Sequence, residues 1–120
     1  MAESRFFNDN TWARAVPACT RADMNNEFMA KLVRAREIAD TPFVINSAFR
    51  TVEHERRQGR AGTSSHTTGR AVDIRCTDSG LRMRIYDALR AVGFNRIGIH
   101  SGFIHVDDSP NHPANVLFLY

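Results

Sequence analysis

Two short segments, residues 64–74 and 103–107, most constrain how this chain folds. The first reads Ser-Ser-His-Thr-Thr-Gly-Arg-Ala-Val-Asp-Ile, and the second reads Phe-Ile-His-Val-Asp. Together they supply His66, Asp73 and His105, two imidazoles and a carboxylate of the kind that binds zinc. Three protein ligands leave the fourth tetrahedral position open for water, as in hydrolytic sites. We therefore expect a fold that gathers these three side chains around one Zn²⁺ ion.

The residues around these ligands resemble the zinc D-Ala-D-Ala carboxypeptidase family, which includes D-Ala-D-Ala dipeptidases and phage L-alanyl-D-glutamate endopeptidases. The shared pattern is Ser-x-His-x-x-Gly-x-Ala-x-Asp at 64–73, His-x-Asp at 105–107 and Ser-x-x-Arg at 47–50. The resemblance spans about residues 22–107. It implies a small α+β fold like that of hedgehog and DD-peptidase domains. In that fold an antiparallel sheet has helices packed on one face and a zinc cleft on the other.

The resemblance also implies an activity, zinc-dependent hydrolysis of amide bonds in the peptide stems of bacterial peptidoglycan. The enzyme would be a D-Ala-D-Ala carboxypeptidase or an endolysin-type endopeptidase. In this family Arg50 would stabilise negative charge that develops on the tetrahedral intermediate, and Ser64 would contact the substrate. The alternatives are a surface role for Arg50 and a loop or capping role for Ser64.

One departure from the family concerns the general base, which takes a proton from the attacking water. Many members carry a carboxylate three residues before the last ligand, where this chain has Gly102. Some carry a histidine two residues before that ligand, where this chain has Phe103. If no other residue serves as the general base, the domain would be a catalytically inactive, zinc-containing module that binds the cell wall.

Two residues are candidates to replace the base. Asp107 lies two residues after His105 and therefore projects on the same face of its strand. His100 lies diagonally across a predicted hairpin from His105 and could act as base or acid. The alternative for Asp107 is an ion pair with Arg96, or a contact that orients a ligand histidine.

The hairpin is predicted over residues 95–107, with a two-residue turn at 101–102. In this register, residues whose numbers sum to 203 face each other. The β-branched residues then share one face, as a buried sheet face requires; they are Ile97, Ile99, Ile104 and Val106. His105 lies on the other face, opposite Gly98, and we expect this glycine to leave room for the metal.

Hydrophobic periodicity predicts two helices, over residues 23–40 and 79–91. Thr20 or Asp23 is expected to cap the first, and one of residues 77–79 to cap the second. Gly93 is expected to close the second helix.

Strands are predicted over residues 43–47 and 70–75, and Asp73 falls on the face of the second strand away from the core. Residues 51–63 form a polar loop with a helical turn around 52–57, which we expect to rim the cleft. Residues 116–120 are apolar enough for a closing strand or a docked tail.

The composition indicates one soluble domain over residues 1–120, with its core at about 20–108. Its hydrophobic content is 42% and its charged content 24%, both ordinary for a globular protein. The net charge is +3, but acidic residues interrupt the arginines. A nucleic-acid binder would show a sustained basic stripe with interleaved aromatic residues. A basic nucleic-acid-associated domain is therefore a lesser alternative, and peptidoglycan peptides are the expected partner.

The first residues lack the pattern of a secretory signal, and no apolar run approaches the length of a membrane span. We expect a monomer that is made in the cytoplasm and binds no membrane. It would reach the wall through phage lysis, a virion or a larger protein. Cys19 and Cys76 are expected to be reduced thiols, and His54 and His112 ordinary surface histidines.

Overall fold

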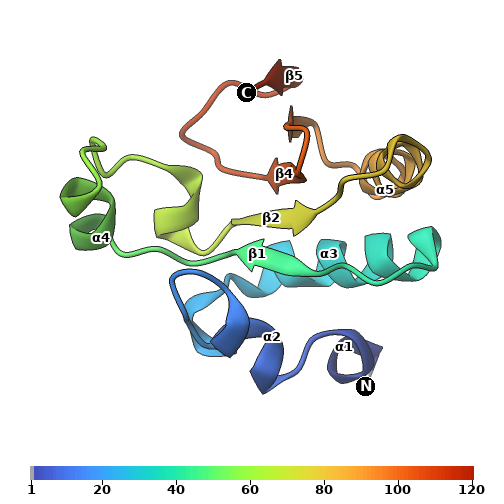
Figure 1. Cartoon of the computed structure of the whole chain (residues 1–120), viewed down its shortest axis with the longest axis horizontal. Helices are drawn as coiled ribbons and strands as arrows, with labels where there is room; N and C mark the ends of the chain where they lie inside the picture. The colour runs from blue at the N-terminus through green and yellow to red at the C-terminus, as the bar shows by residue number, and fades with distance from the viewer. Residues whose placement is uncertain (1) are drawn as a thin grey trace.

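The computed structural model describes residues 2–120, and its centre is a five-stranded sheet of order β1-β2-β4-β3-β5 (Figure 1). The strands are β1 (Ile45–Ser47), β2 (Ala71–Arg75), β3 (Arg96–Ile99), β4 (Phe103–Asp107) and β5 (Val116–Leu119). Neighbouring strands run antiparallel, except that β5 pairs parallel with β3. The α+β fold expected from the sequence is confirmed, with one parallel pair added at an edge.

The two long helices, α3 (Asn26–Ala39) and α5 (Ser79–Ala91), pack against each other and against the apolar face of the sheet. The largest buried side chains of this core include Phe28, Leu32, Ile74, Ile85, Leu89, Ile97 and Ile104. Each such side chain stabilises the fold by roughly 1.5–3 kcal/mol when it leaves water. The opposite face of the sheet carries the polar residues of β2 and β4.

The hairpin of β3 and β4 has the predicted register. Gly98 pairs with His105 and Arg96 pairs with Asp107. The β-branched residues of the two strands therefore share the core face, as expected. His105 accordingly lies on the polar face.

The start of α3 differs from the prediction. Asn25 caps this helix, since its side-chain oxygen accepts a 3.0 Å hydrogen bond from Phe28 N. Thr20 and Asp23 cannot do so, because they close a 3-10 turn of their own, η1 (Arg21–Asp23). The helix α5 begins as predicted, with Asp78 accepting from Leu81 N at 2.8 Å.

Two short helical segments, α4 (Val52–Arg57) and η2 (Ser65–Thr68), connect β1 to β2. Figure 1 shows α4 at the left, at the opposite side of the molecule from α5. Gly69 ends η2 with a φ of 70°, and a Cβ there would lie 2.3 Å from Asp23 O. Only glycine suits this position, so the glycine of the motif shapes the turn between two ligands.

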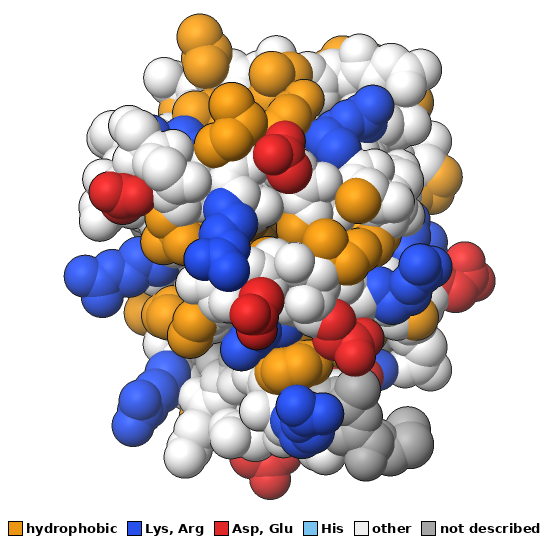
Figure 2. Space-filling view, turned by 90° about the vertical axis from the view of Figure 1, so that its right-hand side faces the viewer, with side chains coloured by type: hydrophobic (Ala, Val, Ile, Leu, Met, Phe, Trp, Pro, Cys, Tyr) orange, Lys and Arg blue, Asp and Glu red, His pale blue; other side chains and the backbone are white. Residues whose placement is uncertain are grey.

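The N-terminal segment with α1 (Ala2–Phe6) and α2 (Asp9–Arg14) brings Phe7 and Trp12 into the core. At the other edge, β5 exposes Leu117 and Leu119. Figure 2 shows hydrophobic side chains gathered at the top of that view, the end at which β5 lies in Figure 1. No helix in the described part of the chain has the length and hydrophobicity needed to cross a membrane.

Candidate metal centre

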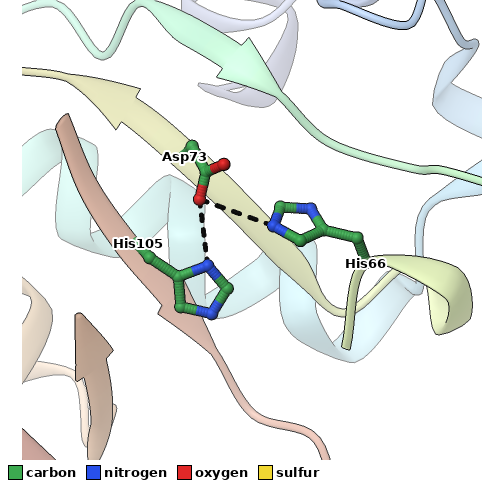
Figure 3. Close-up of side chains that lie close together, drawn as sticks. All are labelled: His66, Asp73 and His105. Carbon is green, nitrogen blue, oxygen red and sulfur yellow. Dashed lines mark hydrogen bonds and ion pairs between the residues drawn. The ribbon is translucent and has the colours of Figure 1, made fainter. Parts of the chain in front are cut away.

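The three predicted ligands come from three different elements and meet on the polar face of the sheet. His66 comes from η2, Asp73 from β2 and His105 from β4. Antiparallel pairing places Asp73 directly opposite His105. All three side chains are buried, and their ligand atoms lie within 4.8 Å of one another. Figure 3 shows them pointing toward one another.

A hydrogen bond to the backbone fixes the orientation of the His66 ring. Its Nδ1–H donates to Ala48 O at 2.6 Å, which leaves Nε2 as an acceptor. Nε2 lies 3.4 Å from Asp73 Oδ1, another acceptor. Two buried lone pairs that face each other require a proton or a cation between them. The donor set of two imidazoles and a carboxylate suits zinc.

His105 is held between two carboxylates. Its Nδ1 lies 2.9 Å from Asp73 Oδ1, and its Nε2 lies 2.6 Å from Asp107 Oδ2. Asp107 is buried, and its Oδ1 also accepts from Arg96 Nε at 2.8 Å and from Ser109 N at 3.0 Å. Asp107 therefore lies on the edge of the imidazole opposite Asp73, with both oxygens engaged.

This geometry does not fit the predicted role of Asp107 as general base. A base must reach the water beside the metal, whereas the imidazole of His105 lies between Asp107 and Asp73. The contacts match the alternative, in which the carboxylate pairs with Arg96 and orients the histidine.

The charges of the site are strongly coupled. Burial raises the pKa of Asp73, but its interactions with the imidazoles of His105 and His66 outweigh burial and hold this pKa well below its usual range. Burial lowers the pKa of His105, and its bonds to Asp107 and Asp73 reverse the shift, so the pKa is raised. Burial likewise raises the pKa of Asp107. Interactions with His105, Ser109 N and Arg96 outweigh burial, so the pKa of Asp107 is lowered. The carboxylates thus stay ionised, as metal binding requires.

Arg50 and Ser64 both lie in the cleft around the ligands. Arg50 Nη2 is 3.5 Å from Asp73 Oδ2, and the arginine side chain is only 14% exposed. A surface role for Arg50 is thereby ruled out. Ser64 caps η2, since its Oγ accepts from His66 N at 3.2 Å. Its position in the cleft leaves the predicted substrate contact open as a second role.

His100, the other predicted acid or base, lies apart from the ligands. It is exposed, its Nδ1 accepts from Gly102 N at 2.9 Å, and its ring stacks on Phe103 at 4.4 Å between centroids. It is not among the described residues that line the cleft.

The space beside Gly98 holds an aromatic ring. A Cβ at Gly98 would lie 2.3 Å from the ring of Phe118, which is itself 5.6 Å from the ring of His105. The expectation that this glycine leaves room for the metal was therefore wrong. It lets β5 place an aromatic wall beside the ligand.

The segment 51–63, which was expected to rim the cleft, supplies Glu55 and Arg60 to its lining. Among the lining residues that sequence reasoning did not assign to the cleft are His112, Phe118 and Tyr120. His112 was expected on the surface, but it is half-buried, and its Nδ1 lies 2.8 Å from Ser109 Oγ. Partial burial raises the pKa of Tyr120 to about 12, so its phenol stays protonated at neutral pH and can donate a hydrogen bond. Alternation in 116–120 could have placed Phe118 and Tyr120 on one face, whereas no spacing signals Glu55, Arg60 or His112.

The chain was compared with known proteins. A model of the Peptidase M15 family matches residues 8–107, and no curated protein matches. Among solved structures, it resembles the L-Ala D-Glu endopeptidase ChiX of Serratia marcescens, with a TM-score of 0.58 and 18% identity over 82% of this chain and 88% of that one. At this identity the likeness shows a shared fold. The family match covers all three ligand positions, and the chain therefore belongs to the M15 peptidases, the zinc carboxypeptidase family that its motifs resemble.

Proposed function

We propose that the protein is a zinc-dependent peptidase that hydrolyses amide bonds in the peptide stems of bacterial peptidoglycan, and thus acts on the cell wall. The convergence of His66, Asp73 and His105 in one cleft carries the proposal. Membership of the M15 peptidases and a fold shared with an L-Ala D-Glu endopeptidase support the substrate class. A D-Ala-D-Ala carboxypeptidase and an endolysin-type endopeptidase are the two activities within this class.

Each residue near the site has a role that its contacts suggest. His66 Nε2, Asp73 Oδ1 and His105 Nδ1 would hold the ion. Zinc in such a site polarises the scissile carbonyl and makes a bound water acidic. Arg50 supplies a fixed positive charge that stabilises the developing negative charge on the carbonyl oxygen. Asp107 keeps His105 in its ligating orientation.

The proposal is tested by digesting purified peptidoglycan and measuring the masses of the released fragments. Zinc-loaded protein should release products with new amino groups, free D-alanine from a carboxypeptidase or shorter peptides from an endopeptidase, and the product masses identify the bond that is cut. The His66→Ala variant and chelator-treated protein should release none. Zinc-loaded wild-type protein that releases nothing would contradict the proposed activity.

A second candidate function is the inactive, zinc-containing module that binds cell wall. The observation that favours it is the lack of a carboxylate at position 102 together with the full engagement of Asp107. Retention on peptidoglycan without any release of peptides, with one zinc bound, would favour this module over the peptidase.

A further inference from the structure

Glu55 is a buried carboxylate in the wall of the cleft that the proposed chemistry does not use. Its side chain has no exposed surface. Its Oε2 accepts a 2.6 Å hydrogen bond from Arg60 Nη1, and its Oε1 lies 3.7 Å from Arg50 Nη1. A buried carboxylate is costly unless it is paired. Glu55 therefore fixes two guanidinium groups side by side in the wall of the cleft.

The backbone at the end of α4 places Arg60 over Glu55. Arg60 N donates to Glu55 O at 2.9 Å, and Gly59 N donates to Arg56 O at 3.0 Å. These two bonds form a Schellman motif, in which Gly59 adopts the left-handed conformation with a φ of 80°. The turn brings the chain back on itself, so Arg60 is held by its backbone as well as by its side chain.

The two arginines retain unused donors. The side chain of Arg60 is 51% exposed and lines the cleft. Only Nη1 of its guanidinium donates to another described residue. The buried Nε of Arg50 has no partner in the described part of the chain. Arg50 is also shared with Asp73, so the unused donors of Arg60 are the positive group open to a ligand. A planar guanidinium fork matches the geometry of a carboxylate.

We propose that Arg60, positioned by Glu55, binds a carboxylate of the substrate and thereby selects stem peptides that carry one near the scissile bond. The inference rests on the proposed peptidase function and names a residue that recognises the substrate. Stem peptides offer two such groups, the α-carboxylate left free by a γ-linked glutamate and the carboxylate at the peptide's C-terminus. Both have the chemistry that a guanidinium fork binds.

The experiment compares wild-type protein with Arg60→Gln and Arg60→Lys. Three synthetic stem peptides are used: one with both carboxylates free, one with the glutamate α-carboxylate amidated, and one with the C-terminus amidated. KM and kcat are measured with zinc, and binding is measured by calorimetry on chelator-treated protein, which cannot turn over. Arg57→Gln is the matched control, because Arg57 lies at the end of the adjoining helix α4, is exposed and pairs with Glu53. Circular dichroism checks that every sample is folded.

Arg60→Gln should weaken binding of the fully free peptide by roughly tenfold and raise KM in proportion, the loss expected for one charge-assisted hydrogen bond. Its kcat should change little, and Arg60→Lys should be intermediate. For one of the two amidated peptides, wild-type protein and Arg60→Gln should have the same KM and the same affinity, because the carboxylate that Arg60 binds is blocked. That peptide identifies the carboxylate.

Two results would overturn the inference. In the first, wild-type protein cleaves the peptides, and Arg60→Gln has the same KM and the same binding affinity as wild-type protein for every peptide. This result would leave the proposed function intact. The other is an equal loss in Arg57→Gln, which would show a general effect of surface charge. If wild-type protein neither binds nor cleaves any of the three peptides, the proposed function falls together with the inference.

Discussion

Both histidines of the candidate metal centre are held in orientation by a hydrogen bond from the ring nitrogen that does not face Asp73. His66 Nδ1–H donates to Ala48 O, and His105 Nε2–H donates to Asp107. Each bond sets which nitrogen faces Asp73. The orientation of the ligands is thus established by folding, before any ion binds. Loss of such a contact typically weakens metal binding by about 10–100-fold.

The role of Asp107 gives the first prediction. Asp107→Asn should weaken zinc binding by about 10–100-fold, because the neutral amide orients His105 less firmly. Competition with a chromogenic chelator measures the zinc dissociation constant. Asp108→Asn is the control, since Asp108 pairs with Arg70 and Lys31 outside the cleft. Unchanged zinc affinity with lost activity would instead support Asp107 as the general base.

The ion pairs of Glu55 give a prediction about pH. Burial raises the pKa of Glu55, but Arg60 and Arg50 outweigh it, so the pKa is lowered. A lowered pKa stabilises the fold above the unfolded-state value of about 4.3 and ceases to do so as the pH falls through the folded-state value. Glu55→Gln should therefore lower the free energy of unfolding by about 1–3 kcal/mol at pH 7.

Urea denaturation of both proteins at pH 7 and at pH 3.5 measures this difference. The gap between wild-type protein and Glu55→Gln should narrow at the lower pH. Glu53→Gln, at an exposed ion pair on the same helix, should change the free energy by less than about 1 kcal/mol. A difference in unfolding free energy between the two proteins that stays constant or increases at pH 3.5 would contradict the stabilising role of the ionised Glu55.

At the scale of elements, local signals predicted most of the sheet and both long helices. The turn at residues 101–102 and the alternation on both sides of it determine the register of β3 and β4. Apart from the convergence of His66, Asp73 and His105, the nonlocal contacts around the cleft were not predicted. The parallel pairing of β5 with β3 brings Phe118 over Gly98, and no pattern within β3 reports it. The contact of Arg60 with Glu55 is local, but it too was not predicted, because the segment has no hydrophobic periodicity that reports it.

The close approach of β5 to β3 can be tested with Gly98→Ala. The added Cβ would overlap the ring of Phe118, so we expect a loss of about 1–3 kcal/mol in the free energy of unfolding. Urea denaturation measures it. Gly80→Ala in α5 is the control, because its Cβ would meet only the flexible Asp78 side chain. Equal stability of Gly98→Ala and wild-type protein would contradict the placement of Phe118.

For the molecule as a whole, the metal centre depends on the complete fold. Its ligands belong to η2, β2 and β4, and its walls to α4 and β5. The sequence predicted that His66, Asp73 and His105 converge, whereas the contribution of β5 to the wall comes from a segment that only the folded chain brings to the cleft. Because an unfolded chain offers no such site, zinc binding should be coupled to folding.

Zinc should accordingly raise the melting temperature. A ligand present at 100 times its dissociation constant stabilises the native state by about 2.7 kcal/mol, which corresponds to several degrees in a domain of this size. Differential scanning calorimetry with and without zinc measures the shift. His66→Ala, which lacks a ligand, should show little or none. A shift of equal size in His66→Ala would place the bound zinc elsewhere.

The central claim is that His66, Asp73 and His105 form one zinc site. X-ray absorption spectroscopy of the zinc-loaded protein, together with metal analysis, tests it most directly. We predict one equivalent of zinc with nitrogen and oxygen ligands, two of them imidazoles, at about 2.0–2.2 Å, and loss of this signal in Asp73→Ala. Less than half an equivalent of zinc, or a sulfur ligand from Cys19 or Cys76, would contradict it.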